Sequence, residues 1–334
     1  MTPEISVVIP VKNAGAVFDE CLCAIRTNHG TMYEIIVVDD CSTDNTAEIA
    51  RKHSGHIINL PQTTGPANAR NTGARATQGD ILFFIDSDII LAPDTLHKLK
   101  QIFQNPNIIA ITGVQSESIR YKNFFSQYKN LWMRYSYMRL PETVALFYTS
   151  CAAIRRKIFL KSGGFDPRYY RPSVEDTDFG QKLEMMGYTV HLRTDIEAEH
   201  VKHYSFLEII KTDFYRSADL LKMTLRNRLS RFLRSNKTSV PSTFMVGVLL
   251  FLSSIPLYLS YLFLSYMRPF SIVACVLILG FFLFINRSFL FWLKSKRGWL
   301  FFLQSIFFLL LDIPVVTGGI IFGAVDYYIR GRHY

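Results

Sequence analysis

The sequence predicts an α/β domain in the first 200 residues, followed by a basic segment and then by transmembrane helices. Three observations support this prediction. Short β-branched runs alternate with helical patterns as far as about residue 200, which is typical of strands and helices in βαβ order. Two uncharged runs, at 244–267 and 269–286, come later and are long enough to cross a hydrocarbon core of about 30 Å. Finally, the first 200 residues are close to neutral, whereas the residues after them carry an excess of Lys and Arg.

The net charge of +10 is concentrated in the second part of the chain. Residues 1–200 contain 21 Lys and Arg against 22 Asp and Glu, residues 201–238 contain 9 against 3, and residues 239–334 contain 7 against 2. The first region therefore lacks the basic surface of a nucleic-acid-binding protein. A basic excess next to apolar helices indicates contact with a membrane surface.

The elements of the first region follow one another in a regular order. Residues 5–11 are an almost continuous β-branched run, as in a strand that is buried on both faces. The strands we expect are 5–11, 34–39, 57–60, 80–85 and 108–112, and the helices are 18–27, 42–53, 67–76 and 93–104. This alternation predicts a parallel sheet covered by helices on both faces, with ligands bound at the carboxyl ends of its strands.

The third apolar region, 299–329, is interrupted by Asp312, Pro314 and Asp326. It is either one long kinked span or a broken, partly re-entrant element, because proline removes a helical hydrogen bond. Basic residues lie before the first span and between the second and third, whereas only Arg268 lies between the first and second. The positive-inside rule then places the N-terminal 240 residues in the cytoplasm.

Polar residues follow two of the expected strands. The first group is the sequence PVKN at 10–13, and the second is DDCSTD at 39–44. Capping of the next helix explains one polar residue in the second group but not two adjacent carboxylates, one of which must face the ligand side. Neither a GxGxxG motif nor a P-loop follows any expected strand, which excludes Rossmann dehydrogenases and P-loop NTPases.

Asp86 and Asp88 come directly after the strand at 80–85. Such a pair is either a solvated turn or a metal site. Two carboxylates at one strand end repel each other, and a hard cation such as Mg²⁺ or Mn²⁺ would neutralise them and bridge to a phosphate.

Five motifs appear in order: SVVIPVKNAG, IIVVDDCSTDNT, GPANARNTGARATQGDILFFIDSDI, SCAAIRRKIFLKSGGFDP and VEDTDFGQKLEMMGYTV. Over about residues 4–205 the chain resembles family 2 glycosyltransferases of the GT-A fold. The resemblance implies an inverting enzyme that uses a nucleotide-diphospho-sugar and a divalent cation. The layout is similar to membrane-bound members that glycosylate lipids or polyprenyl phosphates.

The resemblance also assigns roles to individual residues. Those that would contact the nucleotide-sugar are Pro10, Val11, Asn13, Asp40, Arg70 and Asp86, with Asn71 in the same segment as Arg70. Asp86 and Asp88 would hold the metal, with either His200 or His203 as a third ligand. Two departures are visible: Ala14 stands where many relatives have Glu, and the QxxRW motif of processive polymerases is absent.

Asp176 would be the catalytic base according to the resemblance. The chemistry itself requires such a group, because the acceptor hydroxyl must lose a proton while the leaving diphosphate gathers charge elsewhere. The alternative is that the acidic sequence at 175–178 only favours a helix N-terminus. We expect Asp178 to do this.

These observations predict three parts: a cytoplasmic GT-A catalytic domain at 1–204, a basic amphipathic interfacial helix at 205–238 and a membrane domain at 239–334. The predicted function is transfer of a sugar to a membrane lipid or lipid-linked acceptor at the cytoplasmic leaflet of the cell membrane. Two alternatives stay open. One is a tethered transferase that acts on a soluble or polysaccharide acceptor, and the other is a non-catalytic GT-A scaffold.

Overall fold

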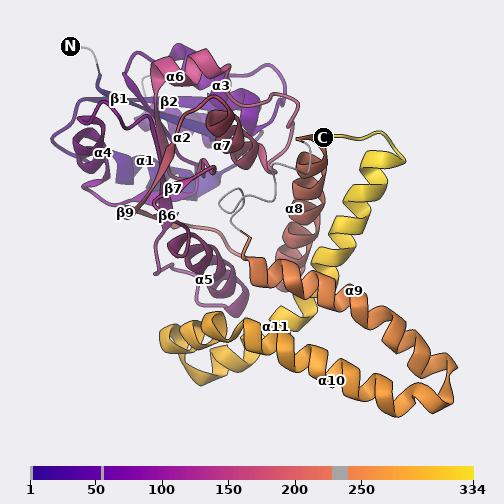
Figure 1. Ribbon diagram of the computed structural model, residues 1–334. Helices are drawn as coiled ribbons and strands as arrows, with labels where there is room; N and C mark the ends of the chain where they lie inside the picture. Colours follow the sequence, from indigo (N-terminus) through magenta and orange to yellow (C-terminus); the bar gives the residue numbers. More distant parts are fainter. Residues whose placement is uncertain (1–2, 54–55, 228–239) are drawn as a thin grey trace.

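The computed structural model describes residues 3–53, 56–227 and 240–334. The last part of the predicted interfacial helix, residues 228–239, lies outside the described residues. One sheet organises the N-terminal region (Figure 1), and its strands follow the order β3-β2-β1-β4-β8-β6-β9-β5, with β7 paired to β9. The strands are β1 Ile5–Val11, β2 Tyr33–Asp39, β3 His56–Asn59, β4 Ile81–Phe84, β5 Ile89–Leu91, β6 Ala110–Gln115, β7 Thr143–Val144, β8 Ala152–Arg155 and β9 Val190–His200.

The sheet is mixed, whereas strand-helix alternation predicts a parallel one. Strands β1 to β4 are parallel, as expected. Strand β8 runs antiparallel to both β4 and β6, and β5 runs antiparallel to β9. The expectation is wrong for these strands. No helix lies between β4 and β5, so these two strands do not form a βαβ unit, and β8 enters the sheet between β4 and β6 from a later part of the chain.

Helices cover both faces of the sheet. Residues Val7 and Ile9 of β1 pack with α1, α2 and α4, whereas Val8 packs with α3, α6 and α7. This alternation follows from the two-residue period of a strand. The helices are α1 Gly15–Arg26, α2 Thr46–His53, α3 Pro66–Ala76, α4 Thr95–Phe103, α5 Phe124–Met138, α6 Arg156–Ser162 and α7 Glu175–Met185.

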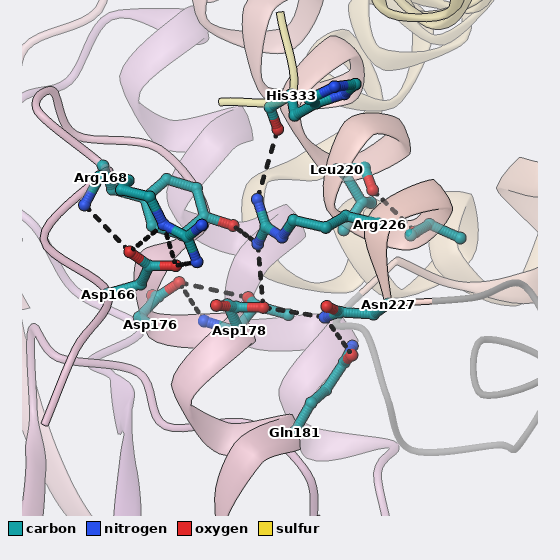
Figure 2. A network of polar contacts seen from close by, with 12 residues as sticks. Asp166, Arg168, Asp176, Asp178, Gln181, Leu220, Arg226, Asn227 and His333 are labelled. Carbon is teal, nitrogen blue, oxygen red and sulfur yellow. Dashed lines mark hydrogen bonds and ion pairs between the residues drawn. The ribbon is translucent and has the colours of Figure 1, made fainter. Parts of the chain in front are cut away.

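Helix α8, Phe206–Arg226, connects the sheet domain to the apolar part of the chain. Its start is fixed by a capping box, in which Ser205 Oγ accepts from Glu208 N and the Glu208 carboxylate accepts from Ser205 N. Its far end is fastened to α7 (Figure 2). Asp178 accepts hydrogen bonds from Arg226 at 3.1 Å and from Asn227 at 2.8 Å. Asp178 therefore ties α7 to α8.

Three helices are long and apolar enough to cross a membrane: α9 Ser242–Phe263, α10 Arg268–Ile285 and α11 Arg287–Tyr328. A short 3₁₀ turn, η2 Ser265–Met267, joins the first two. They differ in burial, since 11% of the apolar window is buried in α9 and in α10 but 44% in α11. The backbone of α11 breaks at Gly298, which has a φ of +83°, and its second part returns along α8 to the sheet domain (Figure 1).

The return of α11 brings the C-terminal residues of the chain into contact with the sheet domain. Tyr334 packs edge-on against Tyr169 at 5.5 Å between ring centroids, and the Arg226 guanidinium lies 4.0 Å from the Tyr334 ring. The C-terminus therefore lies beside the sheet domain (Figure 1). Arg330 and Arg332, which closely precede the C-terminal Tyr334, therefore lie near that domain.

Candidate active site

A cavity of about 930 Å³ opens at the carboxyl ends of β1, β2 and β4. Pro10, Val11, Asp40 and Asp86 line it from these strand ends. Side chains from α3, α5, α7 and α8 complete its wall. The strand-end residues predicted from the sequence thus meet in one place, as expected for a sheet of this class.

Asp40 is buried at the end of β2 and holds the loop before α3. Its Oδ1 accepts from Thr64 N at 2.7 Å, and its Oδ2 accepts from Gly65 N at 2.9 Å. Gly65 has a φ of +87°, and a Cβ there would come within 2.4 Å of the Tyr170 main chain. Asp40 thus fixes the cavity wall. Its Oδ1 also accepts from Thr64 Oγ1 at 3.0 Å, so only Oδ2 keeps a lone pair for a ligand.

Asn13 lies beside the cavity rather than in its wall. Its Oδ1 accepts from Thr43 N at 2.8 Å, and its main-chain N–H donates to Ser42 Oγ at 3.0 Å. These bonds join the two polar loops that follow β1 and β2. The predicted nucleotide contact of Asn13 stays a prediction, and what the structure gives this residue is a loop-joining role.

Arg70 on α3 connects two acidic groups that are far apart in the sequence. Its guanidinium is buried and donates to Asp86 at 2.6 Å and to Glu175 at 2.9 Å. Asp86 also accepts from Ser150 Oγ at 2.6 Å. Burial opposes the charge of Asp86, but the Arg70 guanidinium and then the Ser150 hydroxyl hold the pKa of this carboxyl below its usual range.

Asp88 lies against His200 at the junction of β5 and β9. The Asp88 Oδ2 atom is 3.2 Å from His200 Nε2, and His200 Nδ1 is 3.0 Å from the Gln115 amide nitrogen. His203 lies outside the cavity, with its Nδ1 3.9 Å from Glu208. Of the two predicted histidines, His200 is therefore the one that the fold brings to Asp88.

The predicted metal ligands converge only in part. Asp88 and His200 are in contact, whereas the Asp86 oxygens face Arg70 and Ser150. Within the described ranges, three ligand atoms come within 4.8 Å of one another only at Asp19, Cys23 and His53 on α1 and α2. That group does not line the cavity.

Asp176 stands in the first turn of α7 and lines the same cavity. Its Oδ1 accepts from Thr177 N at 2.6 Å. Burial, and after it the neighbouring Glu175 carboxylate, raise the pKa of Asp176 to about 6. A carboxylate with this pKa suits a general base near neutral pH.

Several residues of the cavity escaped the sequence interpretation. They are Gln115, Tyr148, Ser150, Lys202 and Arg216. Ser150 is the first residue of the motif SCAAIRRKIFLKSGGFDP and lies just before β8, so its place before a strand was a usable signal. Arg216 has no local signal, because only the packing of α8 against the domain turns it toward Asp176.

Comparisons with known proteins agree with this geometry. The family described as Glycosyl transferase family 2 matches residues 6–163. The glycosyltransferase AglE of Haloferax volcanii is 26% identical over 68% of this chain and 76% of its own length. An uncharacterized glycosyltransferase of Haemophilus influenzae is 29% identical over 54% of this chain. The match to the latter spans 61% of that relative's length.

Two solved structures share the fold over nearly the whole chain. The mannosyltransferase PcManGT from Pyrobaculum calidifontis, in complex with GDP-Man and Mn²⁺, has a TM-score of 0.60 at 20% identity and covers 98% of this chain and 88% of its own. S. aureus TarS 1–349, in complex with UDP-GlcNAc, has a TM-score of 0.53 at 18% identity, with 99% and 93% covered. These likenesses confirm the predicted GT-A fold.

Proposed function

Because the chain carries a domain of glycosyl transferase family 2, we propose that it is an inverting glycosyltransferase acting on a lipid or lipid-linked acceptor at the cytoplasmic leaflet. The donor is a nucleotide-diphospho-sugar. The observation that carries this proposal is that Asp176, Asp86 and Asp88, from separate segments of the chain, line one cavity. Inverting transfer needs a base on one side of the anomeric carbon and charge stabilisation on the other.

The donor occupies the strand-end side in this proposal. Asp40 accepts hydrogen bonds from the nucleoside, and Pro10 and Val11 form the floor of its pocket. Arg70 keeps Asp86 ionised. The diphosphate then lies near Asp88, where Lys202 also lines the cavity.

Asp88 and His200 fit a divalent cation, because a carboxylate oxygen and an imidazole nitrogen lie side by side 3.2 Å apart. Asp86 would supply a further oxygen, because each of its carboxylate oxygens accepts one hydrogen bond and retains a lone pair. Imidazole is a softer ligand than oxygen, which favours Mn²⁺ over Mg²⁺. The bound ion would neutralise the charge that gathers on the leaving diphosphate.

Asp176 performs the proton transfer in this scheme. At pH 7 it is mostly ionised because its pKa is about 6. It takes the proton of the acceptor hydroxyl while the oxygen bonds to the anomeric carbon. The bond from that carbon to the nucleotide diphosphate breaks, and the electron pair leaves with the diphosphate.

The membrane assignment rests on α9, α10 and α11, which are long and apolar enough to cross or enter a bilayer. The cavity wall includes α8, and α8 packs against α11. An acceptor anchored in lipid can therefore reach the base without leaving the membrane surface. This proximity supports a lipid acceptor over a soluble one.

A screen of labelled nucleotide-sugars with Mn²⁺ and extracted membrane lipids tests the function. We expect one donor to give a labelled product that partitions into organic solvent, and the Asp176→Asn variant to bind that donor without transfer. Labelled product only in the aqueous phase would support the tethered transferase with a soluble acceptor. Absence of donor binding would support the scaffold instead.

Thiol labelling tests the orientation. Cys23 and Cys41 are exposed on the catalytic domain. We expect an impermeant maleimide to leave both unlabelled in intact cells and to label both after permeabilisation. A cysteine placed at Tyr266, in the exposed turn between α9 and α10, serves as the control and should react from outside. The reverse pattern would invert the topology.

A further inference from the structure

Helices α1 and α2 lie side by side on one face of the sheet and run in the same direction. Where they begin, Ala14 N donates to Thr46 Oγ1 at 3.0 Å. Where they end, Arg26 Nη1 donates to His53 O at 3.5 Å. Each helix begins just after a polar loop, one following β1 and the other following β2. A bond between the two helices would therefore also hold these loops together beside the cavity.

Three side chains with metal-ligating atoms meet between the two helices. Asp19 and Cys23 are one turn apart on α1, so they share a face, and His53 is the last residue of α2. One ligand atom from each of the three lies within 4.8 Å of the others, and His53 Nε2 is 2.8 Å from Asp19 Oδ1. Zinc bonds of about 2.0–2.3 Å place tetrahedral ligand atoms roughly 3–4 Å apart. The group therefore has the spacing of ligands around one zinc ion.

An ordinary ion pair between Asp19 and His53 does not account for the whole group. The pair uses only Nε2 of the imidazole, and His53 Nδ1 is buried with no hydrogen-bond partner in the described part of the chain. Cys23 is a free, exposed cysteine, and no hydrogen bond to its thiol is formed within the described residues. A thiol is thus left unused within reach of an imidazole and a carboxylate, and a metal ion would use all three.

The kinds of ligand in this group determine which ion it suits. A thiolate and an imidazole favour Zn²⁺, whereas Mg²⁺ and Mn²⁺ prefer oxygen ligands. None of the three residues lines the cavity, so an ion bound here is distinct from the cation that we place at Asp88 and His200. Three protein ligands leave the fourth tetrahedral position open to water.

We propose that Asp19, Cys23 and His53 bind one Zn²⁺ ion that joins α1 to α2, with water as the fourth ligand. This site lies outside the proposed transfer reaction and does not depend on it. The ion stabilises the fold, because the three ligands meet only when the two helices are packed together. The chain should still fold without it, since α1 and α2 also share the core cluster that contains Phe18 and Ile49.

Cobalt is a visible probe for this site. The purified full-length chain, in detergent and freed of metal with a chelator, is titrated with Co²⁺. A thiolate bound to Co²⁺ gives a charge-transfer band in the near ultraviolet, and no cysteine is among the described residues that line the cavity. We expect this band to saturate at one equivalent, to disappear when Zn²⁺ is added and to persist in excess Mg²⁺. Absence of the band in the wild type would overturn the inference.

Variants then identify the ligands. Cys23→Ser should lose the band, whereas Cys41→Ser, which removes another exposed thiol of the same domain, should keep it. His53→Gln should weaken Zn²⁺ binding at least roughly 10-fold, since even the partners of metal ligands contribute that much. Zn²⁺ at 100 times its dissociation constant should raise the melting temperature of the wild type by roughly 5 to 10 °C, but not that of Cys23→Ser. A band that survives in Cys23→Ser, or unchanged zinc affinity in His53→Gln, would contradict the site.

Discussion

The two halves of the cavity are built in different ways. The half that we propose to bind the donor, the donor half, consists of strand ends, where Asp40 is held by the main chain of a neighbouring loop. The half that we propose to bind the acceptor, the acceptor half, consists of α5, α7 and α8, which are joined by side-chain pairs such as Arg226 with Asp178. The sheet therefore fixes the donor half, whereas the acceptor half depends on helices that also contact the apolar region. Mutations should affect the two halves separately.

The largest effect is expected from the donor half. Asp88→Ala should abolish transfer, because it removes the carboxylate that lies against His200. The fold should survive, since the Asp88 side chain is part-exposed and its loss costs little stability. Transfer assays with and without excess EDTA, together with a thermal melt, check both statements. Full activity of the variant, or of the wild type in EDTA, would rule out the metal assignment.

Loss of the base comes next and affects the acceptor half alone. Asp176→Asn keeps the shape of the side chain and removes its basicity, so kcat should fall by roughly two to four orders of magnitude. The dissociation constant of the donor should stay the same, because other segments hold the nucleotide. Isothermal titration and initial rates separate the two quantities. If Asp176→Asn kept a near-normal kcat and Glu175→Gln were inactive, Glu175 rather than Asp176 would be the base.

A mutation in the contact between α8 and α11 should disturb the acceptor half from outside the cavity. Gly319→Ala places a methyl group against the Phe214 main chain, and overpacking of this kind costs about 1–3 kcal/mol. The shift of α8 should raise the acceptor KM several-fold and leave donor affinity unchanged. Gly280→Ala in α10, where a Cβ meets nothing within 4 Å, is the control. Equal loss of donor and acceptor binding would show that the halves are not independent.

The smallest effect concerns the pH profile. Because Asp176 acts in its ionised form and has a pKa of about 6, kcat should fall as the pH drops below about 6 and level off above 7. Glu175 raises this pKa, so Glu175→Gln should move the acid limb to lower pH, with a change of only a few-fold at pH 7. Rates measured between about pH 5 and 8 decide this. If the acid limb of the Glu175→Gln variant moved to higher pH, Glu175 would not be the group that raises the pKa of Asp176.

Local patterns were sufficient to predict the first four strands and the strand-end carboxylates. A β-branched run such as Ile5–Val11 forms a buried strand in almost any α/β context, and a polar residue at its carboxyl end must face the ligand edge. Strands β8 and β9 were missed, and pairing over a long stretch of chain is not the reason, because β1 and β4 also pair over such a distance. Strand β9 alternates buried and less buried residues along most of its length, so its pattern was a usable signal, whereas β8 has only four residues, too few for a clear period.

The sequence by itself determined the order of the parts and the residue types of the site. Uncharged runs predict membrane helices through composition alone, and the motifs at Asp40, Asp86 and Asp176 supply the residue types of the proposed chemistry. Tertiary structure decided which of these groups meet. It placed His200 rather than His203 against Asp88 and joined Glu175 to Asp86 through Arg70. Side-chain contacts across more than 100 residues depend on packing, which no local pattern encodes.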